Sequence, residues 1–342
     1  MTTRVVPADL EADRERVLDL WRSGLSHHGK HEEKYRWHYS GRLGGPSQVM
    51  LLEEAGQAIG AAGLSPRRLR AGGEWIEAGL LSDFVLDPEH RVLFPALQLQ
   101  RGTREQGLRR YAVLYGRPNE ASEAVVKRVG YRQLGERVRY AAVVRSASYL
   151  ARYVPRSIAA IPGAAIDAVR RGLRAMAIAR SGFVLRALPG GPDERFDALW
   201  ESASREPGRV IGVRDRAFLD WRFAQCPLHA YRFYALESAG GRLAGYAVAE
   251  THGAVLSVGD FLVDPAEAGA PRALWRGLLA AADRLGLRSV EVILMAGPAT
   301  IAAAHAAGLR PRDRRPIYAT TASAQALLSK EWYLTLADLD DG

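Results

Sequence analysis

The chain carries one strand-like pattern twice, half a chain apart. Asp83–Pro88 (DFVLDP) returns as Asp260–Pro265 (DFLVDP), 177 positions later in a chain of 342 residues. Each copy is followed by a helical pattern, an apolar strand, a second helix and a glycine, Gly130 or Gly308. A repeat of this length exceeds the roughly 20–50 residues of solenoid units and matches two domains of ordinary size. The sequence therefore predicts a duplicated domain.

The composition is that of a globular protein with two buried cores. Hydrophobic residues make up 48% of the chain and charged residues 25%, which excludes compositional disorder. No run of about 18 apolar residues could span a bilayer, and Met1–Leu10 carries Asp9 where a secretory signal needs an apolar core. We expect a cytoplasmic protein. The single cysteine, Cys226, excludes an intrachain disulfide.

The charge is strongly positive and is carried by arginine. The formal net charge is +9, and only four of the 47 basic residues are lysine. Arginine prefers the forks of phosphate and carboxylate groups, which favours an anionic partner. The same excess also fits the Arg-, Ala- and Gly-rich composition of a GC-rich genome, so both interpretations stay open.

Hydrophobic periodicity and turn residues predict the same series of elements in both halves. In the first half we expect helices at Asp9–Gly24, Glu32–Tyr39, Phe94–Gln106 and Asn119–Val129, and strands at Val5–Val6, Gln48–Glu53, Ala58–Pro66, Trp75–Leu86, Tyr111–Tyr115 and Tyr131–Val144. In the second half we expect helices at Pro192–Ala203, Arg214–Phe223, Pro271–Leu285 and Ala299–Ala307, and strands at Tyr231–Glu237, Arg242–Glu250, Val255–Val263, Ser289–Leu294, Leu309–Arg312 and Ile317–Thr321.

A basic helical linker is predicted between the halves. Tyr149–Ser181 alternates arginines with large apolar residues, so the predicted division is a first domain over 1–146, a linker over 147–182 and a second domain over 183–342. A basic amphipathic helix can lie on an anionic membrane surface. The commoner use of such a stripe is packing against the protein, so we expect the stripe to pack on the two domains and expect no peripheral membrane contact.

The order of elements resembles the GNAT N-acetyltransferase family in both halves. The segment 81–91 is similar to the fourth strand and acyl-CoA loop of that family, and 118–131 is similar to its later helix ending at glycine and an aromatic residue. Asp220–Phe223 and the tail Glu331–Leu334 are similar to tandem GNAT proteins. The resemblance implies an α/β (α+β) fold of two tandem GNAT-like domains, each with a mostly antiparallel sheet flanked by helices.

The resemblance also implies the residues that meet acetyl-CoA or another acyl-CoA. In the family the pyrophosphate lies on backbone N–H groups at a helix N-terminus. The cofactor-binding residues implied here are Val85, Leu86, Arg91, Leu93, Ala96 and Asn119. Phe94 stands where the family has glycine, and Pro95 lacks an N–H. In the second half Ala268–Ala273 keeps neither the leading Arg nor the glycine, although Arg272 lies within it.

Catalysis in the family needs a base for the amine and often a tyrosine that protonates the thiolate. The candidate bases are Asp83 and Glu77 on the predicted fourth strand, and Asp83 could equally cap a neighbouring turn. The tyrosine is absent from both copies, because Val126 and Ala304 stand at its position. His305 is one residue away and is a weaker candidate for that role.

No metal site is predicted. The cluster His27–Glu33 holds several ligand types, but it lies in a loop without a matched distant cluster. We therefore expect acyl transfer to an amine of a small molecule or an amino sugar, with the second half structural or shaping the acceptor site. Two alternatives remain: a non-catalytic tandem GNAT-like binding or scaffold protein, and a FemABX-like aminoacyl-tRNA-dependent transferase with nucleic acid as partner.

Overall fold

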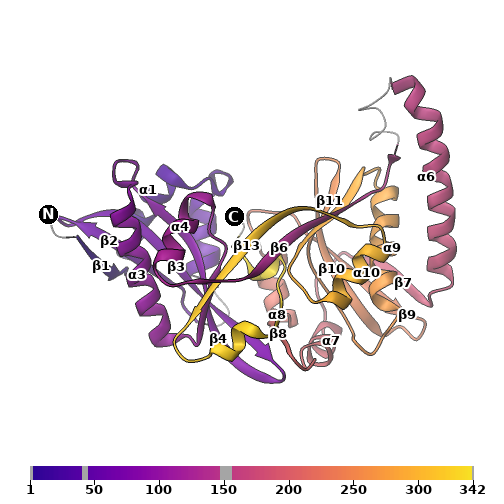
Figure 1. The fold of residues 1–342 in the computed structure, drawn as a ribbon. Coiled ribbons are helices and arrows are strands. Elements are labelled where there is room, and N and C mark those ends of the chain that lie inside the picture. Colours follow the sequence, from indigo (N-terminus) through magenta and orange to yellow (C-terminus); the bar gives the residue numbers. More distant parts are fainter. Residues whose placement is uncertain (1–2, 41–44, 147–155, 341–342) are drawn as a thin grey trace.

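The computed structural model describes residues 3–40, 45–146 and 156–340, apart from the side chains of 156–163 (Figure 1). Its helices and helical turns are α1 (Arg14–Gly24), η1 (His27–Gly29), α2 (His31–Tyr35), η2 (Arg36–Ser40), η3 (Pro88–His90), α3 (Leu93–Arg110), α4 (Glu120–Arg128), α6 (Arg156–Ala179), α7 (Arg195–Ala203), α8 (Arg216–Leu219), η4 (Asp220–Ala224), α9 (Ala270–Arg284), α10 (Pro298–Ala306), η5 (Gln325–Ser329) and η6 (Leu336–Asp338).

The strands are β1 (Thr3–Pro7), β2 (Gln48–Glu54), β3 (Gln57–Ala71), β4 (Glu74–Leu86), β5 (Val113–Gly116), β6 (Arg132–Val143), β7 (Phe183–Leu188), β8 (Arg209–Gly212), β9 (Arg232–Ser238), β10 (Leu243–His252), β11 (Val255–Val263), β12 (Ser289–Leu294), β13 (Arg310–Thr321) and β14 (Glu331–Tyr333). In the described ranges they form one sheet, whose main path runs β1-β2-β3-β4-β5-β13-β6-β12-β11-β10-β9-β7.

The two halves exchange a strand at the centre of this sheet. β6 ends the first half but pairs with β12 of the second, and β13 of the second half pairs with β5 of the first. β6 and β13 lie antiparallel to each other between the halves. Figure 1 shows these two strands as long ribbons crossing the middle of the molecule. The exchange brings a strand of the second half next to β5 of the first. The predicted division of the chain at residues 146 and 182 stays a prediction.

Trp37 of η2 and Trp221 of η4, which occupy similar positions in the two halves, meet between the halves. The rings of Trp37 and Trp221 stack with centroids 5.2 Å apart and planes inclined by 21°. The indole N–H of Trp37 donates to the carbonyl oxygen of Trp221 at 2.9 Å, and that of Trp221 donates to the carbonyl oxygen of Trp37 at 3.3 Å. Each copy of the repeat therefore makes the same contact with the other, as expected of a duplicated unit.

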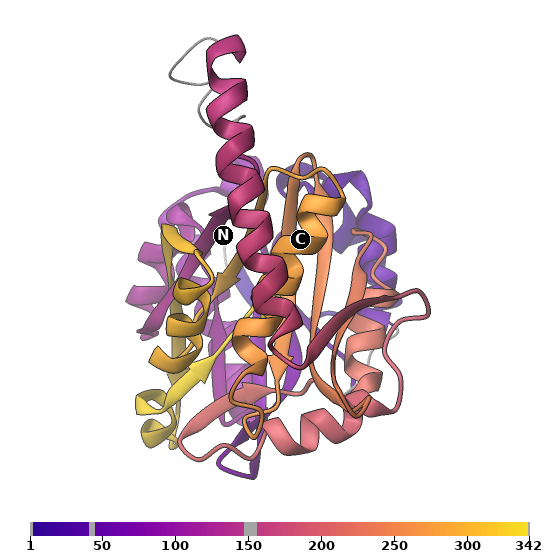
Figure 2. The ribbon, with the colours of Figure 1, turned by 90° about the vertical axis from the view of Figure 1, so that its right-hand side faces the viewer.

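The first half is layered about its sheet. Along β2 the side chains alternate, so that Val49 and Leu51 pack with α1 while Met50 and Leu52 pack with α3. In the second half one core surrounds Trp200 of α7 and Trp275 of α9. No described helix is both long and apolar enough to cross a membrane. Figure 2, turned by 90°, shows α6 crossing the face that is turned towards the viewer, with its first turns extending beyond the rest of the ribbon.

Most predicted elements are present, with three differences. The predicted strands at Leu309–Arg312 and Ile317–Thr321 are one strand, β13, because it bridges both halves. The short strands β7, β8 and β14 were not predicted. The predicted packing of the linker's apolar stripe is wrong for its described part, since Val169 and Leu173 are 63% and 59% exposed. The linker's predicted start, Tyr149–Pro155, lies outside the described residues.

Candidate functional site

A gap opens in the sheet between β4 and β5. These parallel strands pair only from Ala78 to Leu80 on β4. Beyond Leu80, β4 continues to Leu86, whereas β5 ends at Gly116 and the chain turns into the loop before α4. The backbone of Leu81–Leu86 on that side therefore borders a gap rather than a neighbouring strand, which leaves hydrogen-bonding groups available to a ligand.

Two cavities occupy this gap and share lining residues. The inner cavity has a volume of about 220 Å³ and the outer one about 450 Å³. Leu25, Phe84, Asn119 and Ser122 border both, so the two cavities adjoin. Together they form one path from the mouth at the start of α3 to the buried side of β4.

Asp83 is the buried anion at the inner cavity. Its carboxylate accepts hydrogen bonds from the ammonium of Lys34 at 2.7 Å and from the hydroxyl of Tyr39 at 2.6 Å. Nε2 of His27 lies 3.1 Å from Oδ1 of the same carboxylate. Lys34 also donates to Oδ1 of Asp340 at 2.9 Å. One buried lysine is thus held between two carboxylates that come from opposite ends of the chain.

The backbone of this cluster lies in sparsely populated conformations. Asp83 has φ of 48° in a bulge of β4, and His27 and His28 have φ of 36° and 52°. Such conformations in non-glycine residues cost about 1–3 kcal/mol each and are concentrated at functional sites. Gly63 faces the bulge, where a Cβ atom would lie 2.1 Å from the Tyr39 hydroxyl. A side chain at position 63 would therefore displace the cluster.

The cluster keeps its charges at neutral pH. Burial alone would raise the pKa of Asp83, but the charge of Lys34 and the contact with His27 outweigh it and hold that pKa well below its usual range. Burial alone would lower the pKa of Lys34, but Asp340 and Asp83 raise it. Burial and Asp83 raise the pKa of Tyr39 well above its usual value. Asp83 is therefore a poor proton acceptor, while Lys34 and Tyr39 retain their protons.

The predicted cofactor-binding residues all border the outer cavity, which is lined in part by Val85, Leu86, Arg91, Leu93, Ala96 and Asn119. Of the two predicted bases, Asp83 borders the inner cavity. Glu77 borders neither of these two cavities: its side chain is 57% exposed and lies 3.7 Å from Arg68. Asn119 also caps α4, since its side-chain oxygen accepts from the N–H of Ser122 at 2.9 Å.

The mouth of the outer cavity is apolar. Val92 and Leu93, which line it, are 62% and 48% exposed, whereas Phe94, 69% exposed, borders a separate pocket beside Val5 and Met50. The start of α3 presents the N–H groups of Leu93 and Phe94, and Pro95 supplies none. The Arg91 guanidinium donates to the carbonyl oxygens of Leu86 and Ser23, which holds it beside the cavity. The size and lining of the cavity are compatible with an extended acyl-CoA arm along β4. The start of α3 would offer the phosphates fewer N–H donors than a glycine-rich loop does.

The second half contributes to the first half's site. Tyr318 of β13 and Asp340 of the C-terminal tail both border the inner cavity, next to Val126. Sequence reasoning missed Tyr318, Asp340, His27 and Lys34. His27 lies in the His27–Glu33 cluster, which was considered as a metal site, and Lys34 follows it directly. A local pattern cannot signal a strand exchange or a tail contact across 306 positions.

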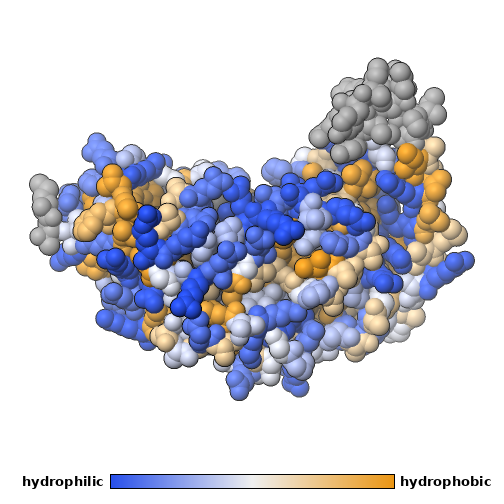
Figure 3. Space-filling model, viewed as in Figure 1, coloured by the Kyte–Doolittle hydropathy of each residue, from blue (hydrophilic) through white to orange (hydrophobic). Residues whose placement is uncertain are grey.

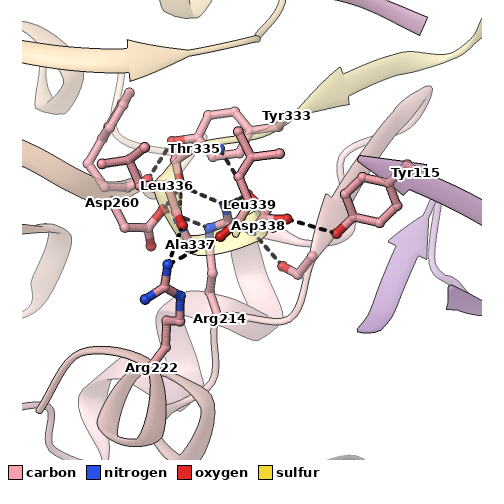
Figure 4. Close-up of polar contacts among 12 residues, drawn as sticks. Tyr115, Arg214, Arg222, Asp260, Tyr333, Thr335, Leu336, Ala337, Asp338 and Leu339 are labelled. Carbon is pink, nitrogen blue, oxygen red and sulfur yellow. Dashed lines mark hydrogen bonds and ion pairs between the residues drawn. The ribbon is translucent and has the colours of Figure 1, made fainter. Parts of the chain in front are cut away.

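The tail fills the corresponding gap in the second half. β11 and β12 pair only from Val255 to Val258 on β11, and the tail enters beyond that point. Leu334 bridges to Met295, and the Tyr333 hydroxyl donates to the carbonyl oxygen of Phe261. Figure 4 shows the tail residues beside Asp260, the repeat partner of Asp83. This half therefore holds its own C-terminal segment where the first half has cavities.

A buried ion cluster fixes the tail in place. Arg214 is fully buried and contacts Asp260 at 3.1 Å as well as Asp338. Thr335 donates to Asp260 at 2.6 Å, and Arg222 donates to the carbonyl oxygen of Leu336 at 2.8 Å (Figure 4). Burial raises the pKa of Asp260, against the effect of Arg214. Asp260 therefore has a structural role, in which it holds Arg214 and Thr335.

The remaining candidates take no part in these cavities. His305 lies on α10 with its ring 5.5 Å from that of Tyr140. The hydroxyl of Tyr115 donates to the carbonyl oxygen of Asp338 at 3.2 Å and helps to hold the tail. Within the described ranges, no group of three or more His, Cys, Asp or Glu side chains is arranged to hold a metal ion.

Comparison with solved structures finds the same arrangement in known proteins. A GCN5-related N-acetyltransferase from Anabaena variabilis ATCC 29413 matches with a TM-score of 0.65 at 11% identity, covering 94% of this chain and 73% of its own. Eis1 from Mycobacterium abscessus matches with a TM-score of 0.55 at 18% identity, covering 95% and 74%. A tandem GNAT protein from the clavulanic acid biosynthesis pathway matches with a TM-score of 0.54 at 18% identity, covering 94% and 98%. No family model matches the sequence, and no curated protein matches it. The chain therefore has the fold of tandem GNAT proteins.

Proposed function

We propose that the protein is an acyl-CoA-dependent N-acyltransferase whose site is the gap between β4 and β5 of the first half. The observation that carries the proposal is the pair of adjoining cavities in that gap, with the charged cluster of Asp83, Lys34 and Asp340 at the inner end. Acetyl-CoA is the donor to test first, and an amine of a small molecule or an amino sugar is the acceptor class. Because acyl-CoA is a cytoplasmic metabolite, the proposal includes a cytoplasmic location.

The outer cavity is proposed to bind the CoA arm. The exposed backbone of Val85 and Leu86 would hydrogen-bond the arm in the manner of a neighbouring strand. The N–H groups at the start of α3 would face the pyrophosphate, where the helix dipole favours negative charge. The apolar side chains of Val92 and Leu93, which line this cavity, would cover the arm and exclude water from it.

His27 is proposed as the proton acceptor. Its Nε2 lies 3.1 Å from Oδ1 of Asp83, and both ring nitrogens are buried without a hydrogen bond of good geometry among the described residues, so a small turn of the ring would let Nε2 donate to the carboxylate. A carboxylate that accepts from one ring nitrogen leaves the other as an acceptor. In the reaction the amine nitrogen bonds to the thioester carbonyl carbon and the carbon–sulfur bond breaks. The amine proton passes to His27, and Asp83 orients the ring.

The second half is proposed to complete the site. Burial and the hydrogen bond to Glu123 raise the pKa of Tyr318, so its phenol keeps a proton that the departing thiolate can take. Asp340, with a side chain only 12% exposed, would attract an acceptor that arrives as an ammonium ion. The tail would therefore shape the acceptor pocket and discriminate among amines.

Thiol release from acetyl-CoA in the presence of a panel of amines and amino sugars tests this function. The wild type should release thiol with at least one acceptor. His27→Asn should lower turnover at saturating acceptor by about a hundredfold, the low end of general-base effects, and should leave the affinity for acetyl-CoA unchanged. His252→Asn, at an exposed position on β10, is the matched control. Failure of the wild type to bind acetyl-CoA in calorimetry would sink the proposal.

A further inference from the structure

Helix α6 exposes a stripe of large apolar side chains. Ile166, Val169, Leu173 and Met176 are 41%, 63%, 59% and 50% exposed. With 3.6 residues per turn, these four positions fall within a sector of about 80° on the helix. Buried contacts lie on another side, where Arg174 donates to the carbonyl oxygen of Leu279 at 3.1 Å. The stripe is therefore not the face that packs on the body.

A basic groove runs beside the stripe. It has a volume of about 470 Å³ and lies between α6, α9, α10 and the strands β6 and β13. Its floor is apolar, with Val143, Leu173 and Leu279 among its residues. Its charged lining consists of five arginines and no carboxylate: Arg170, Arg174, Arg276, Arg310 and Arg312. Such a lining favours an anionic partner that also offers apolar groups.

The arginines of the groove keep their charge available. Arg170 donates to the hydroxyl of Ser146, and Arg310 donates to backbone carbonyl oxygens, so neither is neutralised by those contacts. Among the described residues, no carboxylate lies within ion-pair distance of Arg276 or Arg312. Figure 3 shows hydrophobic (orange) and hydrophilic (blue) residues interspersed along this edge of the molecule.

The positive charge of this surface favours an anionic bilayer over a second copy of the chain as its binding partner. A second copy of the chain would bring the same arginines against one another, and like charges in contact are unfavourable. The one carboxylate of α6, Asp167, accepts from the N–H of Ser146 through both oxygens and cannot relieve that repulsion. An anionic bilayer offers phosphate groups to the arginines and hydrocarbon to the stripe at the same time.

We propose that the α6 surface, which comprises the stripe 166, 169, 173 and 176 and the adjoining arginine groove, docks on a bilayer containing anionic phospholipid. The helix of 24 residues is about 36 Å long, and its first turns extend beyond the body (Figure 2). It can therefore lie in the headgroup region while the body stays outside. The surface is separate from the cavities between β4 and β5, and the inference does not rest on the proposed acyl transfer.

Co-sedimentation of the full chain with vesicles tests this docking. Vesicles of phosphatidylcholine alone are compared with vesicles that also contain phosphatidylglycerol. The wild type should bind only the anionic vesicles, and added salt should weaken binding because headgroup attraction is screened. Val169→Gln with Leu173→Gln should weaken binding about tenfold or more, because two apolar side chains no longer enter the bilayer.

Control variants separate docking from folding and from self-association. Ala175→Gln places the same new side chain on another face of α6, at an exposed position, and should bind as the wild type does. Circular dichroism of each variant should report unchanged helix content, since all three positions are exposed. The proposal is overturned if the wild type does not bind anionic vesicles, or if the double variant binds them as strongly as the wild type does. The proposal is also overturned if the wild type forms dimers and does not bind vesicles, while the double variant is monomeric. The surface would then bind a second copy of the chain.

Discussion

Oδ1 of Asp340 lies 2.9 Å from Nζ of Lys34, a residue 306 positions earlier in the chain. Lys34 is 1% exposed and also contacts Asp83 at 2.7 Å. The C-terminal tail thus passes through the gap of the second half and reaches the cavity of the first. One segment therefore fills one gap and borders the cavity in the other.

Removing the charge of Lys34 should destabilise the fold. Lys34→Met leaves Asp83 buried beside Tyr39 without its cation, which costs about 3–5 kcal/mol of unfolding free energy. Urea unfolding measures the loss. Adding Asp83→Asn should recover part of it, because the unpaired charge is gone. If the double variant is as unstable as the sum of the single ones, the two residues do not act as a pair.

The same pair makes stability depend on pH. The pKa of Asp83 is depressed on folding, so its contribution is present above the unfolded value of about 3.9 and is lost as the pH falls towards the folded value. The pKa of Lys34 is raised, so its contribution is present below about 10.4 and is lost as the pH rises through the folded value. The unfolding free energy should therefore fall on both sides of that window.

Unfolding titrations from pH 3 to pH 11 check this dependence, over a range that brackets both ordinary values by about one unit. The Lys34→Met, Asp83→Asn variant should have a flatter profile at both ends. Asp19→Asn, whose side chain is 74% exposed, is the control and should keep the wild-type profile. An unchanged profile in the double variant would contradict the assigned titrations.

Gly24 keeps the outer cavity open. A Cβ atom at this position would lie 2.4 Å from Cγ2 of Val85 and 2.9 Å from Nη2 of Arg91, and both residues border the cavity. Gly24→Ala should weaken acetyl-CoA binding about tenfold in calorimetry, because Val85 must shift into the space for the arm. Helix α1 should not weaken, since alanine is the better helix former. Gly240→Ala, with open space around it, should bind as the wild type does.

The cluster that holds the tail should be structural. Arg214→Leu leaves the carboxylates of Asp260 and Asp338 buried without their cation and should lower the unfolding free energy by about 3–5 kcal/mol. Arg216→Leu, at a side chain that is 56% exposed, should cost far less. At a temperature where the protein is folded, Arg214→Leu should retain acetyl-CoA binding. Loss of binding without loss of stability would place a ligand at this cluster instead.

The sequence predicts the repeated elements well because their signals are local. The apolar runs of β4 and β5 and the Asp-Pro turn at the end of each hexapeptide copy identify the strands that border the gap. The six predicted cofactor-binding residues follow from that alignment, and the structure places all of them around one cavity. The features that the sequence does not reveal are non-local: β13 lies between β5 and β6, and Asp340 contacts Lys34 across 306 positions of the chain.

His27 illustrates a second limit. It lies in a histidine-rich loop for which the sequence predicts no site, yet it is buried beside Asp83 in a left-handed conformation. A positive φ at a non-glycine residue is imposed by the surrounding packing, so the sequence carries no local signal for this backbone conformation. Glu77 shows a third limit. It lies on β4 as predicted but borders neither cavity, because strand alternation alone does not say which stretch of β4 faces the gap.

Hydrogen–deuterium exchange with and without acetyl-CoA tests the central claim, that the first half's gap is the acyl-CoA site and the second half's gap is closed. The account predicts protection of backbone amides within 84–96 and 117–125, which border the outer cavity, and no change within 259–273 and 295–301. Protection in the second half, or no protection in either half at saturating acetyl-CoA, would contradict it.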